Sequence, residues 1–205
     1  MTPLRWVRNL VGVAAITLAV LFAPRCSHDE PRQLTVYGDV GTFSFENHDG
    51  RSVGPETLRG APWILDFIFT SCTGTCSVMS QRMQALQGAL ADVPDLKLVS
   101  ITCDPDRDTK ERLAQYSKGY NADPDRWFFV TGDKQSIQSF SIQTLKLGMQ
   151  EATSEEQAKG MERIIHSSRL VLIDAEGRIR AYHNGTEEGA AKRVADDVRA
   201  LLAER

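Results

Sequence analysis

The chain has 205 residues, of which 41% are hydrophobic and 25% are charged, a composition typical of one globular domain with a short appendage. A formal net charge of -3 leaves no excess of basic residues for a phosphate backbone, so nucleic acid is excluded as a partner. The four cysteines are too few for a scaffold held by disulfides, and the apolar segments are sufficient to form a core.

The N-terminal segment, residues 1–26, predicts a signal peptide or a membrane anchor. Arg5 and Arg8 precede an apolar run from Leu10 to Ala23, which is the pattern of an export signal. As a helix this run is about 21 Å long, shorter than the ~30 Å hydrocarbon layer, so both alternatives fit. We favour a retained single anchor in the cell membrane because residues 22–26 lack a small-x-small cleavage site. The positive-inside rule then places the rest of the chain in the periplasm or an equivalent space.

Residues 27–33 predict a polar linker, and residues 34–205 predict one domain in which strand and helix patterns alternate. Strands are expected over residues 34–46 with a hairpin turn at Asp49-Gly50, and over 62–70, 96–102, 127–130, 169–174 and 178–183. Helices are expected from the turn at residue 72 to residue 91, and over 109–118, 134–145 and 187–203.

The polar segment 148–163 predicts a loop with a helical turn, and such a long insertion often lies over a functional site. Strands alternate with helices and the chain ends in the order hairpin then helix. This order predicts an α/β, thioredoxin-like fold with an N-terminal β-hairpin extension.

Cys72 and Cys76 stand four residues apart where the strand over 62–70 gives way to a helix. At this spacing two sulfurs lie on one face, close enough to chelate one ion or to form a disulfide. A helix N-terminus favours thiolates, which are both the nucleophiles of redox exchange and the preferred ligands of Cu(I). The spacing does not decide between these uses, but the polar residues at 71, 73–75 and 77 disfavour a pair of packed core cysteines.

The segment over residues 67–80, FIFTSCTGTCSVMS, resembles the signature of the SCO/SenC copper chaperones. Residues 102–109, TCDPDRDT, resemble the Asp-Pro-x-x-Asp-Thr segment of that family, and residues 166–174, HSSRLVLID, resemble its distal His leading into a strand. The resemblance covers about residues 34–203, and three separated motifs in the same order make it specific.

This resemblance implies a site in which Cys72, Cys76 and His166 hold a copper ion before its delivery to the dinuclear copper centre of a haem-copper respiratory oxidase. Two thiolates suit Cu(I), and a neutral imidazole allows Cu(II) to be held as well. Zinc is disfavoured because structural zinc sites usually have four Cys or His ligands. The implied partners are the copper-receiving subunit of the oxidase, and thiol-disulfide oxidoreductases or other copper carriers.

Three positions depart from the family pattern. Thr73 and Ser77 stand where the family commonly has proline, and Arg163-Ile-Ile precedes His166 where an acidic residue is often found. Thr73 and Ser77 are expected to alter the rigidity of the cysteine turn and the thiolate pKa values. The residues before His166 are expected to affect how firmly the His166 side chain is held in the site.

The alternative function is a membrane-tethered thiol-disulfide oxidoreductase that uses Cys72 and Cys76 as its redox pair, and the two functions are compatible. Asp66 lies six residues before Cys72, as a buried acid does in thioredoxins, and a proton relay to the second thiol is one role for it. A peroxiredoxin is disfavoured because the partner thiol is one helical turn away. The leading prediction is therefore a metallochaperone and not an enzyme with turnover. Cys103 is expected to be an inert thiol at a strand end, and Cys26 a free juxtamembrane thiol.

Overall fold

The computed structural model describes residues 33–204. The predicted anchor, Cys26 and almost all of the predicted linker lie outside the described residues. Within residues 33–204 no helix is both long enough and apolar enough to cross a membrane.

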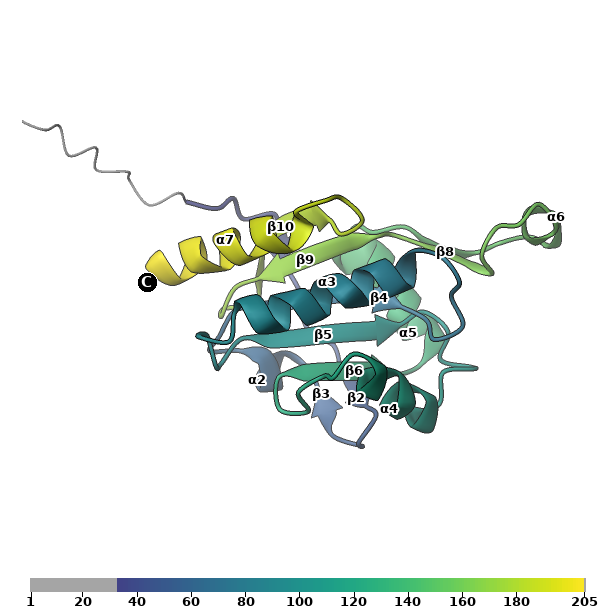
Figure 1. The fold of residues 1–205 in the computed structure, drawn as a ribbon, viewed down its shortest axis with the longest axis horizontal. Coiled ribbons are helices and arrows are strands. Elements are labelled where there is room, and N and C mark those ends of the chain that lie inside the picture. The colour runs from purple at the N-terminus through teal and green to yellow at the C-terminus, as the bar shows by residue number, and fades with distance from the viewer. Residues whose placement is uncertain (1–32, 205) are drawn as a thin grey trace, which may run out of the picture. The chain divides into compact units, whose positions relative to one another are not determined.

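The strands of residues 33–204 form one eight-stranded sheet and one separate pair. Figure 1 shows the central strands of the large sheet with helices packed against it. In spatial order the large sheet consists of β1 (Gly38–Asp39), β10 (Arg178–Asn184), β9 (Arg169–Ile173), β4 (Trp63–Ile68), β5 (Lys97–Thr102), β6 (Trp127–Thr131), β2 (Phe45–Asn47) and β3 (Ser52–Val53). The central strands β4, β5 and β6 are parallel, and the strands on both sides of them are antiparallel. The predicted turn at Asp49-Gly50 joins β2 to β3, and the predicted hairpin β9–β10 is confirmed. The single strand expected over residues 34–46 is wrong: Gly41, at φ +60°, interrupts it, and its two parts, β1 and β2, lie near opposite edges of the sheet.

Strand β4 is buried along its whole length. Trp63 is 1% exposed, and Ile64, Leu65, Phe67 and Ile68 are fully buried. A strand covered on both faces has no side that favours polar residues, so its sequence is a continuous apolar run and not an alternating one. Asp66 is the exception, and it is also fully buried.

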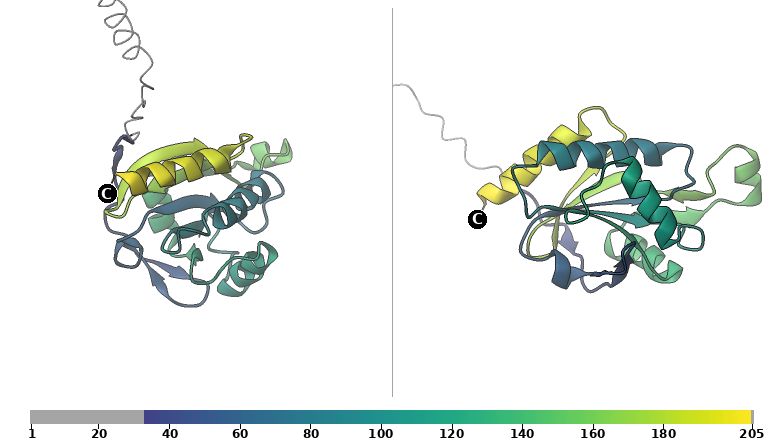
Figure 2. Two further views of the ribbon diagram at one scale, coloured as in Figure 1. Left: turned by 60° about the vertical axis from the view of Figure 1, so that its left-hand side comes forward. Right: turned by 60° about the horizontal axis from the view of Figure 1, so that its bottom comes forward.

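The helices of the described residues are α2 (Pro55–Leu58), α3 (Thr75–Ala89), α4 (Lys110–Gly119), α5 (Lys134–Ser139), α6 (Ser154–Ala158) and α7 (Ala190–Ala203), with a π-helical turn η1 (Phe140–Thr144) after α5. The β4-α3-β5 and β5-α4-β6 crossovers are right-handed, so α3 and α4 lie over the same face of the sheet. Helix α7 packs against α3 on that face. Helix α5 covers the other face (Figure 2). Thr109 caps α4, its hydroxyl oxygen accepting a hydrogen bond from the Arg112 amide.

Two further segments differ from their predictions. Residues 148–163 are not only a loop with a helical turn: β7 (Met149–Glu151) and β8 (Ile164–His166) form an antiparallel pair on either side of α6. We call residues 149–166 the β7–β8 hairpin, and Figure 1 shows that α6 at its tip projects from the body. The expected helix over 134–145 continues beyond α5 as the π-helical turn, so its hydrogen-bonding pattern changes midway.

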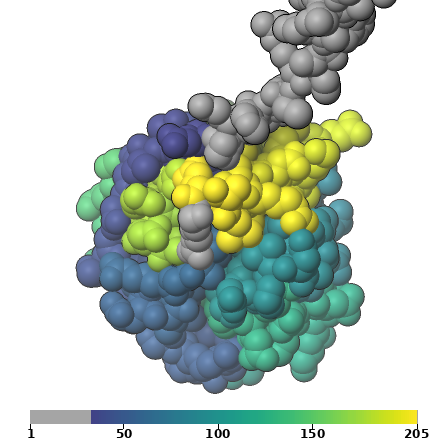
Figure 3. Space-filling view, turned by 90° about the vertical axis from the view of Figure 1, so that its left-hand side faces the viewer, coloured from purple at the N-terminus to yellow at the C-terminus, as the bar shows by residue number. Residues whose placement is uncertain are grey.

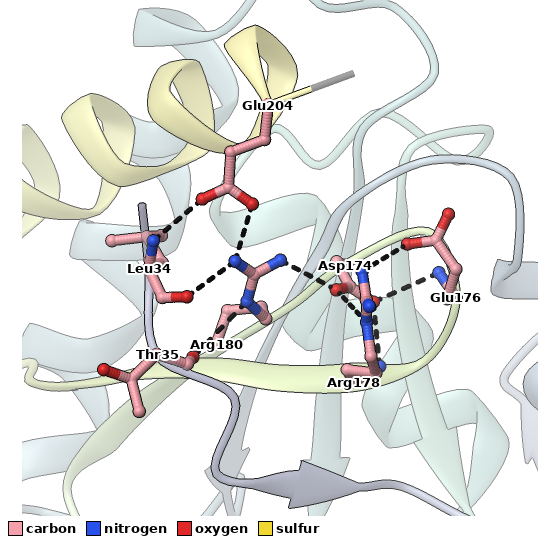
Figure 4. Close-up of polar contacts among 7 residues, drawn as sticks. All are labelled: Leu34, Thr35, Asp174, Glu176, Arg178, Arg180 and Glu204. Carbon is pink, nitrogen blue, oxygen red and sulfur yellow. Dashed lines mark hydrogen bonds and ion pairs between the residues drawn. The ribbon is translucent and has the colours of Figure 1, made fainter. Parts of the chain in front are cut away.

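The first described residues are fixed beside the end of α7 (Figures 3 and 4). The Leu34 amide donates to Glu204 Oε1 at 2.8 Å, and the Leu34 carbonyl oxygen accepts from Arg180 Nη2 at 2.7 Å. Arg180, only 5% exposed, also contacts Asp174 at 3.0 Å and Glu204 at 2.6 Å. A buried guanidinium needs such partners because an uncompensated buried charge is costly.

Candidate metal centre

The predicted site lies where the parallel strands end. β4 ends at Ile68 and β5 ends at Thr102, and these two residues are paired in register. Cys72 lies in the turn after β4, and Cys76 lies in the first turn of α3, which begins at Thr75. The carboxyl ends of parallel strands are a common place for a functional site because the loops after them converge there.

The buried carboxylate of Asp108 holds the ends of β4 and β5 together. Its Oδ2 accepts from the Thr70 amide at 3.0 Å and from the Thr102 hydroxyl at 2.5 Å. Its Oδ1 accepts from the Thr70 hydroxyl at 2.5 Å. The turn that carries Cys72 therefore begins from a fixed point only two residues upstream.

The two cysteines differ in exposure and in acidity. Both are free thiols; Cys72 is half-buried and Cys76 is 1% exposed. A hydrogen bond from the Cys76 thiol lowers the pKa of Cys72 to about 6, and backbone amides of Cys76 and Gly74 add to this effect. The same hydrogen bond, together with burial, raises the pKa of Cys76. At neutral pH Cys72 is thus the thiolate and Cys76 the protonated partner.

We predict that Cys72 reacts with iodoacetamide with a midpoint near pH 6 in the reduced protein, the thiolate fraction falling as pH falls below that value. Replacing Cys76 with alanine removes the first cause of the low pKa, so the midpoint should rise towards the usual cysteine value of about 8.5. Alkylation rates from pH 4 to 9, with the modified residue identified by mass spectrometry, check this. An unchanged midpoint in Cys76→Ala would mean that the hydrogen bond between the thiols is not the cause.

His166, at the end of β8, reaches the cysteine turn from a distant part of the chain. Its Nε2 lies 3.4 Å from Cys76 Sγ, and its Nδ1 lies 3.1 Å from the Ser167 carbonyl oxygen. Because a carbonyl oxygen only accepts, Nδ1 carries the proton and Nε2 presents its lone pair to the cysteine side. Burial lowers the pKa of His166, so the ring is the neutral imidazole that binds metals.

The structure places the three predicted ligands close together, but their side chains are not arranged around one ion position. Cys76 contacts both Cys72 and His166, which makes it the central member of the group. Among residues 33–204 no cluster of three or more His, Cys, Asp or Glu side chains has the spacing of a formed metal site. The donor types, two sulfurs and one imidazole nitrogen, nevertheless fit a soft metal ion.

Asp66 lies deeper in the sheet than the cysteines. Burial raises its pKa to about 7. Ser100 donates to its Oδ1 at 2.6 Å, and Trp127 Nε1 donates to the Ser100 hydroxyl at 3.0 Å. Its Oδ2 has no hydrogen-bond partner. The third cysteine within residues 33–204, Cys103, is 3% exposed, and burial raises its pKa. Both properties agree with the inert strand-end thiol that the sequence predicts.

Two contacts at the site involve residues that the sequence did not single out as functional. Thr73 donates to Glu162 through both its amide and its hydroxyl, and Arg163 forms an ion pair with the buried carboxylate of Asp104. Both contacts join the β7–β8 hairpin to the body. The sequence signal for them is only the position of Glu162 and Arg163 a few residues before His166.

Comparison with known proteins identifies the family. The fold is thioredoxin-like, and the SCO1/SenC family model matches residues 32–203. The chain is 32% identical over 184 residues to the SCO1 protein homolog of Bacillus subtilis, covering 89% of this chain and 92% of that one. It is 36% identical over 129 residues to a putative copper-binding protein of Stutzerimonas stutzeri, covering 62% of this chain and 60% of that one.

Comparison with solved structures indicates the same family. The structure of BsSco, a member of the Sco family of cytochrome c oxidase assembly proteins in which a disulfide switch was identified, matches with a TM-score of 0.72 and 28% sequence identity. The match covers 85% of this chain and 100% of that chain. The chain belongs to the SCO1/SenC family.

Proposed function

We propose that this protein is a metallochaperone that binds one copper ion through Cys72, Cys76 and His166 and delivers it to the dinuclear copper site of a haem-copper respiratory oxidase. The observation that carries the proposal is the 3.4 Å approach of His166 Nε2 to Cys76 Sγ, between residues 90 positions apart. The copper-binding relative and the oxidase-assembly role of the Sco family support the same cargo and the same recipient.

The protonation states of the three side chains suit copper binding. Cys72 is ready as a thiolate, and His166 offers a neutral nitrogen. Cys76, whose pKa is raised, must lose its proton when the ion binds, so copper uptake releases a proton. Two thiolates favour Cu(I), and the imidazole extends the range of the site to Cu(II).

The exposure of the site suits transfer. Cys72 is half-buried, whereas Cys76 is almost inaccessible. A recipient therefore approaches from the Cys72 side, where its own ligands replace those of the donor one at a time. The partners we propose are the copper-receiving subunit of the oxidase, and other copper carriers or thiol-disulfide oxidoreductases that load the site or keep it reduced.

We further propose that residues 1–26 anchor the protein in the cell membrane and that the domain lies in the periplasm or an equivalent compartment. This part of the proposal rests on the two arginines and the apolar run of the sequence. An oxidising compartment also fits a protein whose cysteine pair needs a reductant before it binds Cu(I).

Titration of the reduced protein with Cu(I) tests the proposal. We expect one ion per chain and an X-ray absorption spectrum dominated by two sulfur neighbours with one nitrogen. Replacing both Cys72 and Cys76 with serine should abolish the binding. Uptake of no copper by the reduced protein, or retention of full binding in the double variant, would refute the proposed site.

The second candidate is a thiol-disulfide oxidoreductase acting through Cys72 and Cys76. It is favoured by the contrast between the lowered pKa of the half-buried Cys72 thiol and the raised pKa of the buried Cys76 thiol, which suits a nucleophile and its resolving partner. Asp66, with a pKa of about 7, is the candidate proton relay for this reaction, although its hydrogen bond goes to Ser100.

A further inference from the structure

Glu162 contacts the peptide between the two cysteines. Its Oε1 accepts the Thr73 amide at 2.9 Å and the Thr73 hydroxyl at 2.7 Å. The carboxylate also lies against Gly74, where a Cβ would be 3.3 Å from Oε1. The side chain of one residue in the β7–β8 hairpin thus holds the backbone of the cysteine turn at the point where the turn enters α3.

The β7–β8 hairpin depends on such contacts for its position. Its strands pair only with each other, and an isolated two-stranded hairpin is at best marginally stable in water. Near its base, Arg163 pairs with Asp104, and Glu151 pairs with Lys134 at 2.5 Å. These two ion pairs fix the hairpin to the β5–α4 loop and to α5. Neither of them touches the cysteine turn.

The Glu162–Thr73 contact is the polar link that joins the two halves of the site. Glu162 lies four residues before His166, and Thr73 lies between Cys72 and Cys76. The other contacts that hold the hairpin near the turn are the approach of His166 to Cys76, the edge-to-face contact of His166 with Phe69, and the burial of Met149 and Ile164 in the core. The Glu162–Thr73 link is the one that bonds to the backbone between the two cysteines. Position 73 is suited to the task because threonine supplies two donors, whereas proline would supply neither.

We propose that Glu162 is a positioning residue for the copper site: by accepting both donors of Thr73 it holds His166 beside Cys76 before the ion arrives. This inference rests on the proposed function and names the side chain that orders its third ligand. Because His166 is already held in place, less conformational entropy is lost when the ion binds. The Glu162–Thr73 contact therefore slows copper release, although Glu162 does not touch the metal.

The test compares three variants of the full-length protein in detergent. Glu162→Ala removes the acceptor, and Glu162→Gln keeps an acceptor oxygen. Glu155→Gln removes an equal charge from the same hairpin, where Glu155 pairs with Lys159 on the exposed surface of α6. The readouts are hydrogen exchange of the Ala152 and Ser167 amides, which are bonded to Arg163 and Gly148 across the hairpin, nuclear Overhauser effects between the His166 ring and Cys76, and the rate of Cu(I) release to a chelator.

We expect Glu162→Ala to accelerate both amide exchange and copper release about threefold to tenfold, as the loss of one or two partly exposed hydrogen bonds implies, and to weaken the Overhauser effects. Glu162→Gln should restore most of each value, and Glu155→Gln should match the unmodified protein. In a double-mutant cycle, Thr73→Val should have little further effect in the Glu162→Ala background, because Glu162→Ala has already removed the acceptor of the Thr73 hydroxyl.

The proposal is wrong if Glu162→Ala leaves the His166–Cys76 Overhauser effects intact, or if copper release does not accelerate in a protein that binds the ion. Failure of the unmodified protein to bind copper would refute the proposed function instead. In that case the exchange and Overhauser measurements still decide whether Glu162 positions His166.

Discussion

Replacing His166 with alanine is expected to weaken Cu(I) binding more than about 100-fold. Loss of an outer-shell partner alone typically costs 10–100-fold in metal affinity, and His166 offers the nitrogen that faces Cys76 at 3.4 Å. A chelator competition at fixed pH measures the change. His48→Ala is the matched control, because His48 lies between β2 and β3, and its backbone amide donates to Phe129 on β6.

The same variant separates the two candidate functions. The hydrogen bond that lowers the pKa of Cys72 comes from Cys76 and not from the imidazole, so His166→Ala should keep its low-pH alkylation midpoint and its rate of disulfide exchange. If the variant bound copper as tightly as the unmodified protein, His166 would not be a ligand. Thiol-disulfide exchange would then be the better explanation of the cysteine pair.

Replacing Asp108 with alanine is expected to lower the free energy of unfolding by about 3–5 kcal/mol. The substitution leaves the Thr70 amide, the Thr70 hydroxyl and the Thr102 hydroxyl without their acceptor. Thr102 and Asp108 are fully buried, and Thr70 is half-buried. Buried donors left unpaired cost about 1–3 kcal/mol each, and partial relaxation offsets some of that total. Urea unfolding followed by circular dichroism measures the loss.

Two controls isolate the cause of that loss. Asp106→Ala, in the same loop, removes an exposed carboxylate that pairs with Lys134, and an exposed ion pair contributes at most about 1 kcal/mol. Asp108→Asn keeps an acceptor oxygen and should fall between the two. An Asp108→Ala protein as stable as Asp106→Ala would contradict the role of Asp108 in joining the strand ends.

The central elements could be predicted from the sequence because burial on both faces leaves a clear pattern. The apolar run over residues 62–70 predicts β4, and the helix expected from the turn at residue 72 to residue 91 corresponds to α3. The β7–β8 hairpin could not be predicted in the same way. Its strands have three residues each and pair only with each other, so neither strand shows the alternation that a half-buried strand displays.

The site was predictable to the extent that its residues carry distinctive chemistry. Two cysteines at one helical turn stand out in any sequence, and His166 was named from the family resemblance, not from spacing. The roles of Glu162 and Asp108 were not predicted. The Thr70–Asp108 contact joins residues 38 positions apart, and the Thr73–Glu162 contact joins residues 89 positions apart. Glutamate, aspartate and threonine are too common on surfaces for their presence to indicate a pair.

The attachment of Leu34 beside Arg180 and Glu204 sets how far the cysteines stand from the place where the preceding chain joins the body. Asp174, a partner of Arg180, follows Ile173, which pairs with Trp63 at the amino end of β4, whereas Cys72 lies beyond the carboxyl end. The length of β4 alone therefore separates the two by about 20 Å. The attachment of Leu34 and the cysteine turn thus lie at opposite ends of β4. Because β4 is paired on both sides within the sheet, this separation stays constant whatever binds at the cysteines.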